Sequence, residues 1–117
     1  MSRPAATVDE VLFVYGSLLD AAHRASLLGR EVTGLPARLE GYARMRGRYF
    51  YIVECVGSFT DGLVLTGLNE RDFAVLDRYE DAPRLYTRAR VEVTSAGDKM
   101  LRCWVYLPTA KLLASAS

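Results

Sequence analysis

The sequence contains few of the residues that usually bind metal ions. Its 117 residues include two cysteines and one histidine, and Cys55 and Cys103 show neither a Cys-x-x-Cys nor a Cys-x-x-His spacing. We therefore expect no metal site. Each cysteine lies in an apolar, strand-like run, which predicts two buried and reduced thiols.

Long hydrophobic runs and an excess of charge of one sign are also absent. No apolar run approaches the roughly 20 residues that cross a bilayer, and the formal net charge is +1. Such a near-neutral balance disfavours bulk attraction to nucleic acid or to a membrane surface. Residues 1–6 (Met-Ser-Arg-Pro-Ala-Ala) have no apolar core of the kind that a signal peptide requires. We expect a cytoplasmic protein with neither a nucleic-acid nor a membrane partner.

What is present fits one globular domain. Hydrophobic residues make up 50% of the chain and charged residues 25%, which is ordinary for a folded, water-soluble domain. A chain of this length builds one core. We predict a single domain over residues 1–117, with loose tails at 1–8 and 109–117, the second of which is a helical turn or a frayed end.

The chain is organised around residues 11–20 (Val-Leu-Phe-Val-Tyr-Gly-Ser-Leu-Leu-Asp). The run 11–15 is apolar on both faces, which predicts a central, buried strand. A helix over 18–28 follows, with Ser17 as its cap and Gly29 as its stop. A strand that enters a helix through a Gly-Ser turn leaves backbone N–H groups free, and these suit an anionic group.

The middle of the chain reads as strands and turns. Residues 31–42 predict a strand broken by a turn, 49–53 a strand, 57–62 a hairpin-like turn and 63–68 another buried strand. The arginines at 44, 46 and 48 stand beside aromatic residues. This pattern fits single-stranded nucleic acid, through phosphate contacts and base stacking. It also fits a solvated arginine face, which the near-neutral total charge favours.

A helix over residues 70–80, capped by Asn69, carries the most informative acid. Phe73, Leu76 and Glu80 share one helical face. A carboxylate at this place opposes the helix dipole and loses water, so its pKa should rise. Two alternatives remain at this stage: Glu80 points to water, or an arginine such as Arg88 pairs with it. Asp77 lies at the edge of this helical face, so a solvated or capping role suits it better.

Two strands complete the chain. Residues 85–93 alternate apolar with polar, as a half-exposed strand does. A turn at 96–98 and a last strand over 100–107 follow, and we see no second domain.

Three segments together resemble the gamma-glutamylcyclotransferase-like superfamily, in particular its AIG2-like and gamma-glutamylamine cyclotransferase branch. They are Val14-Tyr15-Gly16-Ser17-Leu18, Leu76-Asp77-Arg78-Tyr79-Glu80 and Leu85-Tyr86-Thr87-Arg88. The resemblance extends from Val11 to Leu107. It implies a small α+β fold in which a mixed, barrel-like sheet carries a few flanking helices and a pocket at one end of the barrel.

The resemblance also implies roles for individual residues. Substrate binding falls to Tyr15, Gly16, Ser17 and Leu18, whose turn offers backbone N–H groups to the glutamyl part of the substrate. The acid/base role falls to Glu80, and Tyr86 and Tyr106 line or support the pocket. The chain departs from the family pattern at Asp81, where relatives often have glycine, and in residues 44–51. Both departures bear on substrate choice.

The reaction implied is an intramolecular ring closure of a small γ-glutamyl substrate, which releases 5-oxoproline and a free amine without metal or organic cofactor. Ser17 as a nucleophile is a rival enzyme reading. It is disfavoured because the turn is not Gly-x-Ser-x-Gly and the single histidine, His23, has no evident orienting carboxylate. A rival of another class is a non-catalytic module that keeps the same pocket and binds a small molecule.

Overall fold

The computed structural model describes residues 11–116, so the predicted tail at 1–8 lies outside the described residues. The elements in chain order are β1 (Leu12–Val14), the 3-10 turn η2 (Ser17–Leu19), α1 (Ala21–Leu28), β2 (Gly34–Arg46), β3 (Phe50–Leu65), α2 (Glu70–Glu80), β4 (Tyr86–Ser95), β5 (Lys99–Pro108) and α3 (Ala110–Ala116).

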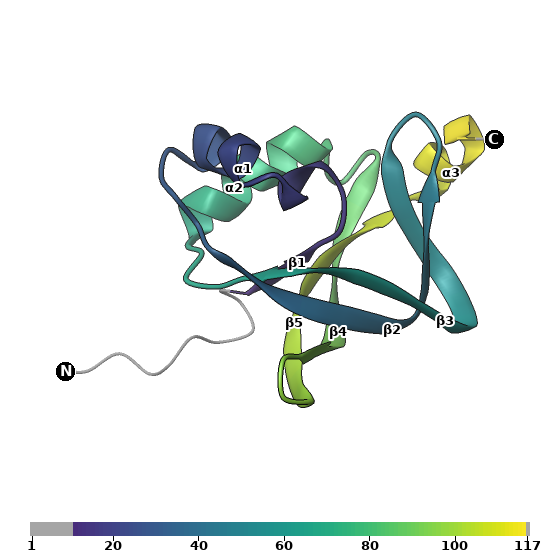
Figure 1. Ribbon diagram of the computed structural model, residues 1–117. Coiled ribbons are helices and arrows are strands. Elements are labelled where there is room, and N and C mark those ends of the chain that lie inside the picture. Colours follow the sequence, from purple (N-terminus) through teal and green to yellow (C-terminus); the bar gives the residue numbers. More distant parts are fainter. Residues whose placement is uncertain (1–10, 117) are drawn as a thin grey trace.

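The strands close into a barrel in the order β1-β3-β2-β4-β5. β1 runs parallel to β5, and the other neighbouring pairs are antiparallel. The sheet is therefore mixed, and the predicted α+β fold with a barrel-like sheet is confirmed. Figure 1 shows α1 and α2 together on one side of the barrel, whereas the β4–β5 hairpin extends from the opposite side.

β2 and β3 form one long ladder that bends in the middle. Glu40 pairs with Phe59 and Tyr42 pairs with Glu54, so residues 55–58 bulge opposite Gly41. The bulge divides the ladder into a part within the barrel and a distal arm, which we define as residues 42–46 and 50–54 with the tip 47–49. Figure 1 shows the distal arm rising beside α3.

The hairpin-like turn predicted at residues 57–62 is wrong. This segment continues β3 through the bulge, and the chain reverses instead at the tip of the distal arm. Gly57 has a φ of 87°, a conformation that glycine adopts in turns and in bulges alike. A glycine-rich, polar stretch therefore could not distinguish the two from the sequence.

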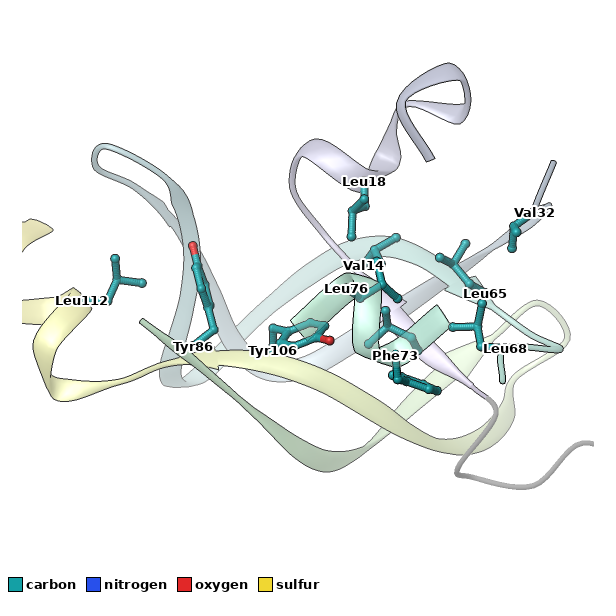
Figure 2. Packing of buried hydrophobic residues seen from close by; sticks show 11 residues of the cluster. Val14, Leu18, Val32, Leu65, Leu68, Phe73, Leu76, Tyr86, Tyr106 and Leu112 are labelled. Atoms are coloured by element: carbon teal, nitrogen blue, oxygen red, sulfur yellow. The ribbon is translucent and has the colours of Figure 1, made fainter. Parts of the chain in front are cut away.

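β1 lies between two layers of the core, as its apolar character on both faces predicts. Val11, Phe13 and Tyr15 belong to a cluster of strand and strand-flanking residues that fills the barrel. Leu12 and Val14 face the other cluster, which includes residues of α2 and α3. Figure 2 shows Val14 close to Leu76 and Phe73 of α2. Burial of each such side chain contributes about 1.5–3 kcal/mol, so β1 anchors α2 on the barrel.

The first helix begins later than the sequence predicts. A single 3-10 turn occupies residues 17–19, and the Asp20 side chain then caps α1 by accepting a hydrogen bond from the Ala22 N–H at 3.1 Å. Ser17 is not the cap. Asp20 is as good a capping residue as Ser17, and the buried Leu18 fixes the turn before it. Gly29 ends α1 in the left-handed conformation, as expected.

The chain end, predicted over 109–117 as a helical turn or a frayed tail, is helical up to residue 116 and packs on the core. Residues 110–116 form α3, and Leu112 is 2% exposed within the core. The Thr109 hydroxyl accepts a hydrogen bond from the Leu112 N–H at 3.4 Å. One buried leucine and one capping threonine hold this short helix on the barrel.

The two cysteines are free thiols in different surroundings. Cys103 is buried, as predicted, and burial raises its pKa to about 12. The prediction of burial is wrong for Cys55, which lies exposed in the bulge. The apolar run that contains Cys55 is strand, but the bulge turns that residue away from the core.

Within residues 11–116 no helix is both long and apolar enough to cross a bilayer. The same part of the chain contains no group of three or more histidine, cysteine, aspartate or glutamate side chains that could hold a metal ion.

A substitution at Gly62 tests how closely β1 and β3 approach each other. A Cβ atom at this position would overlap the Val14 carbonyl oxygen and lie 2.8 Å from the Phe13 ring. We expect Gly62→Ala to lower the free energy of unfolding by about 3 kcal/mol or more. Gly57→Ala is the control, because a Cβ there meets open space and costs only about 1–2 kcal/mol of backbone strain. Urea unfolding of both variants measures the difference, and equal losses would contradict the close approach.

Candidate active site

A cavity of about 400 Å³ lies where β1, the end of α2 and the tip of the distal arm meet. All of the residues that the sequence singled out for a site line this one cavity: Tyr15, Gly16, Ser17, Leu18, Glu80, Tyr86 and Tyr106. They come from four separate parts of the chain. The fold thus brings the Tyr-Gly-Ser-Leu turn and the end of α2 to the same space.

Glu80 is the last residue of α2 and lines the cavity from the helix end. Phe73 and Leu76, on the same helical face, are 5% and 0% exposed, so the face that carries Glu80 points into the protein. Burial raises the Glu80 pKa to about 7. The alternative in which Arg88 pairs with Glu80 is not observed, because the Arg88 Nε lies 3.0 Å from Asp77 Oδ1.

Asp77 has a different place from the solvated or capping role predicted for it. It accepts a hydrogen bond of 2.6 Å from the Tyr106 hydroxyl in addition to its ion pair with Arg88. The prediction was wrong because both partners lie on β4 and β5, and helical periodicity does not reveal which strand lies beneath a helix. Asp77 thereby fastens the C-terminal half of α2 to the barrel.

The turn after β1 is held from the distal arm. The Arg44 guanidinium donates a hydrogen bond to the Tyr15 carbonyl at 3.0 Å. Gly16 packs so near the arm that a Cβ there would lie 3.2 Å from the Phe50 Cβ. The Gly16 carbonyl accepts from the Leu19 N–H at 3.0 Å, which closes the 3-10 turn. In such a turn the first N–H groups, those of Ser17 and Leu18, have no acceptor within the turn itself.

Three buried tyrosines of the cavity wall, Tyr15, Tyr86 and Tyr106, each use the hydroxyl as a donor. Tyr15 donates to the Tyr106 carbonyl and Tyr86 to the Phe50 carbonyl, both at 2.6 Å. Tyr106 donates to Asp77, as described above. Burial is the main cause that raises the pKa of all three phenols above its usual value. They are therefore neutral at physiological pH and serve as fixed walls. Figure 2 shows Tyr86 with its hydroxyl directed toward the β2–β3 hairpin.

Tyr79 is a cavity residue that the sequence reasoning missed. Its hydroxyl lies 2.6 Å from Ser17 Oγ and 2.8 Å from His23 Nε2. Ser17 therefore meets the imidazole only through this tyrosine, which does not match a serine nucleophile with a histidine base. The signal available in the sequence was the position of Tyr79 next to Glu80 in the quoted helix motif.

Asp81 follows Glu80 in the left-handed conformation, with a φ of 57°. This conformation favours glycine and is tolerated by aspartate. The left-handed conformation explains why the family pattern often has glycine at this position. Aspartate can replace glycine here while the backbone keeps the same conformation. The Asp81 carboxylate forms an ion pair with Arg84, and both residues line the outer part of the cavity.

Comparison with known proteins gives the context of this cavity. The family model described as gamma-glutamyl cyclotransferase, AIG2-like matches residues 12–116. A protein of Methanocaldococcus jannaschii, named as a gamma-glutamylcyclotransferase and "putative RNase", is 24% identical over 99 residues, which cover 82% of this chain and 45% of that protein. The Arabidopsis thaliana protein AIG2 C is 35% identical over 85 residues, which cover 70% of this chain and 50% of that one. The chain thus spans about half the length of the curated relatives it matches.

The fold has a counterpart among solved structures. A structure described as gamma-glutamyl cyclotransferase superposes with a TM-score of 0.76 at 20% identity, and the match covers 86% of this chain and 66% of that one. The barrel and its flanking helices therefore agree with the fold that the sequence resemblance implied.

The burial of Glu80 predicts a pH-dependent stability. Its pKa lies at about 7 in the folded protein against 4.5 for an unburied glutamate. The folded state thus holds the proton more tightly, and this contribution to stability is lost as the pH rises from about 4.5 to about 7. Relative to wild type, Glu80→Gln should gain about 2 kcal/mol in free energy of unfolding between pH 5 and pH 8.

Urea unfolding at pH 5 and pH 8 measures this gain. Glu70→Gln, at the exposed first residue of α2, is the matched control and should show no comparable change. A pH-independent difference between wild type and Glu80→Gln would mean that Glu80 is solvated.

Proposed function

The chain belongs to the gamma-glutamyl cyclotransferase, AIG2-like family, and on this premise we propose that it releases 5-oxoproline and a free amine from a γ-glutamyl amine or γ-glutamyl amino acid. Glu80 is the general acid/base of this reaction. The observation that carries the proposal is the Glu80 carboxyl in the cavity wall, with burial raising its pKa to about 7. The substrate is a small molecule, and no cofactor takes part.

The reaction is an acyl transfer within one substrate molecule. The α-amino nitrogen attacks the γ-carbonyl carbon, and a C–N bond closes the five-membered ring. The old amide C–N bond then breaks, and the leaving nitrogen departs with an added proton. Because both reacting groups belong to one molecule, a cavity that folds the substrate correctly lowers the entropic part of the barrier.

Proton transfer is the task for which Glu80 is suited. The attacking amine must be unprotonated, so a base takes its proton, and the leaving nitrogen must then receive one. A carboxyl with a pKa of about 7 exists in both forms near neutral pH and can perform the two transfers in turn. An ordinary, solvated glutamate would be too weak a base for the first transfer.

The remaining groups of the cavity support this division of roles. The tyrosine hydroxyls of Tyr15, Tyr86 and Tyr106 already donate to fixed acceptors, so they shape the site and do not carry the proton. The N–H groups at the start of the 3-10 turn, in Ser17 and Leu18, can hold the glutamyl part of the substrate. They can also stabilise negative charge that develops on the γ-carbonyl oxygen.

The test is the release of 5-oxoproline by purified protein from a panel of γ-glutamyl amines and γ-glutamyl amino acids, without added metal. We expect Glu80→Gln to lower kcat by about 10²–10⁴-fold, the usual contribution of a general acid/base. The variant should be at least as stable as wild type at pH 8, so a loss of activity there does not reflect unfolding, and Glu70→Gln should keep full activity.

Other outcomes would favour the rival interpretations. Loss of activity in Ser17→Ala with full activity in Glu80→Gln would support a serine nucleophile. Substrate binding without turnover across the panel would support a non-catalytic binding module.

A pH profile gives an independent measurement. Glu80 must be ionised to accept the proton of the attacking amine, so kcat/KM should rise as the pH increases and level off above about 7, the Glu80 pKa. A rise centred near pH 4.5, or one unchanged in Glu80→Asp and in Glu80→Gln, would assign the base to another group.

A further inference from the structure

The cavity has a buried inner end and an exposed outer end. Tyr15, Tyr86 and Tyr106 form the inner wall and are 6%, 4% and 3% exposed. Arg48 and Tyr49, at the tip of the distal arm, line the outer end and are exposed. A substrate whose γ-carbonyl reacts beside Glu80 therefore places its glutamyl part inward. Its leaving amine extends toward the tip of the distal arm.

The charge at that outer end is positive. The distal arm contains three arginines and one acidic residue, Glu54, which lies opposite Tyr42 at the end of the arm away from the tip. Across from the arm, Arg84 is neutralised by its ion pair with Asp81. The distal arm thus carries a net positive charge, and one of its arginines lines the outer end, so a negative group on the leaving amine would be attracted there.

Of the arginines of the distal arm, Arg48 is the one placed to bind a negative group on the leaving amine. Arg44 is engaged with the Tyr15 carbonyl, and Arg46 lies 5.3 Å from the Phe50 ring centroid without lining the cavity. The Arg48 guanidinium lies 5.9 Å from the Tyr49 ring centroid. Within the described residues no carboxylate forms an ion pair with it. Its planar set of N–H donors matches the two oxygens of a carboxylate.

We propose that Arg48 is a specificity-determining residue that binds a carboxylate on the leaving amine, so that the chain prefers γ-glutamyl amino acids to γ-glutamyl amines. The inference rests on the proposed cyclotransferase function and adds the chemical class of its leaving group. A neutral alkylamine leaves Arg48 without a partner, and a cationic leaving group such as a diamine is repelled by it.

The experiment compares kcat/KM for γ-glutamyl-alanine and γ-glutamyl ethylamide, which differ in the leaving-group carboxylate. We expect wild type to prefer the alanine substrate about tenfold, the size of a partly exposed charged hydrogen bond. Arg48→Gln should reduce this preference to near unity through a higher KM for γ-glutamyl-alanine, with the ethylamide unaffected. Arg46→Gln removes the same charge from the same arm and should keep the wild-type preference.

A charge reversal sharpens the test. Arg48→Glu should prefer γ-glutamyl-putrescine, whose leaving group is cationic, over γ-glutamyl-alanine. Equal loss of both original substrates in Arg48→Gln would place the glutamyl part of the substrate at Arg48 and overturn the proposal. Equal turnover of the two by wild type would also overturn it while the cyclotransferase function stands. No 5-oxoproline from any substrate would refute that function itself, and this inference with it.

Discussion

The burial of one ionisable group, the Glu80 carboxyl, depends on how firmly α2 is seated on the barrel. Phe73 and Leu76 are fixed in the core, and the face of the helix that bears Glu80 is fixed with them. The start of the helix is held by a capping box between Asn69 and Asp72. Arg30 donates two hydrogen bonds of 2.7 Å to Asp72, which lower the pKa of that carboxyl. A helix held at both ends can keep an acid half-buried at its last residue.

Two acidic side chains one helical turn apart, Asp77 and Glu80, lie in different surroundings. Asp77 forms an ion pair with Arg88 and accepts a hydrogen bond from the Tyr106 hydroxyl. Glu80 faces the cavity, and burial dominates its pKa. The strands β4 and β5 supply both partners of Asp77. The barrel therefore serves two purposes in this region: it anchors the helix through one acid and leaves the next acid available for proton transfer.

Much of the fold could be predicted because its signals are local. The apolar run 11–15, the Asn69 cap and the stripe of Phe73, Leu76 and Glu80 are patterns within one element, and each was found where expected. Apart from the start of α1, which Asp20 caps in place of Ser17, the errors concern contacts between distant segments. Residues 55–58 form a bulge because only Gly41 lies opposite them in the partner strand, and this bulge exposes Cys55. Leu112 is buried because β5 carries α3 back onto the core.

The same distinction holds for the cavity. Its inner residues, such as Tyr15 and Glu80, belong to short motifs that the sequence displays. Arg48 and Tyr49 carry no motif, and only the bend in the β2–β3 ladder brings them to the cavity. The chemistry of the inner end could thus be read from the residues, whereas the neighbours of the outer end required the folded chain.

The bulge opposite Gly41 has a consequence for how this fold can diversify. The pairing that closes the barrel lies on one side of the bulge, and the tip at residues 47–49 lies on the other. Replacement or lengthening of the tip would change the rim of the cavity and leave the barrel hydrogen bonds in place. Descendants of such a chain could acquire new ligands through a few residues of one loop, while the proton-transfer group and the scaffold beneath it stay the same.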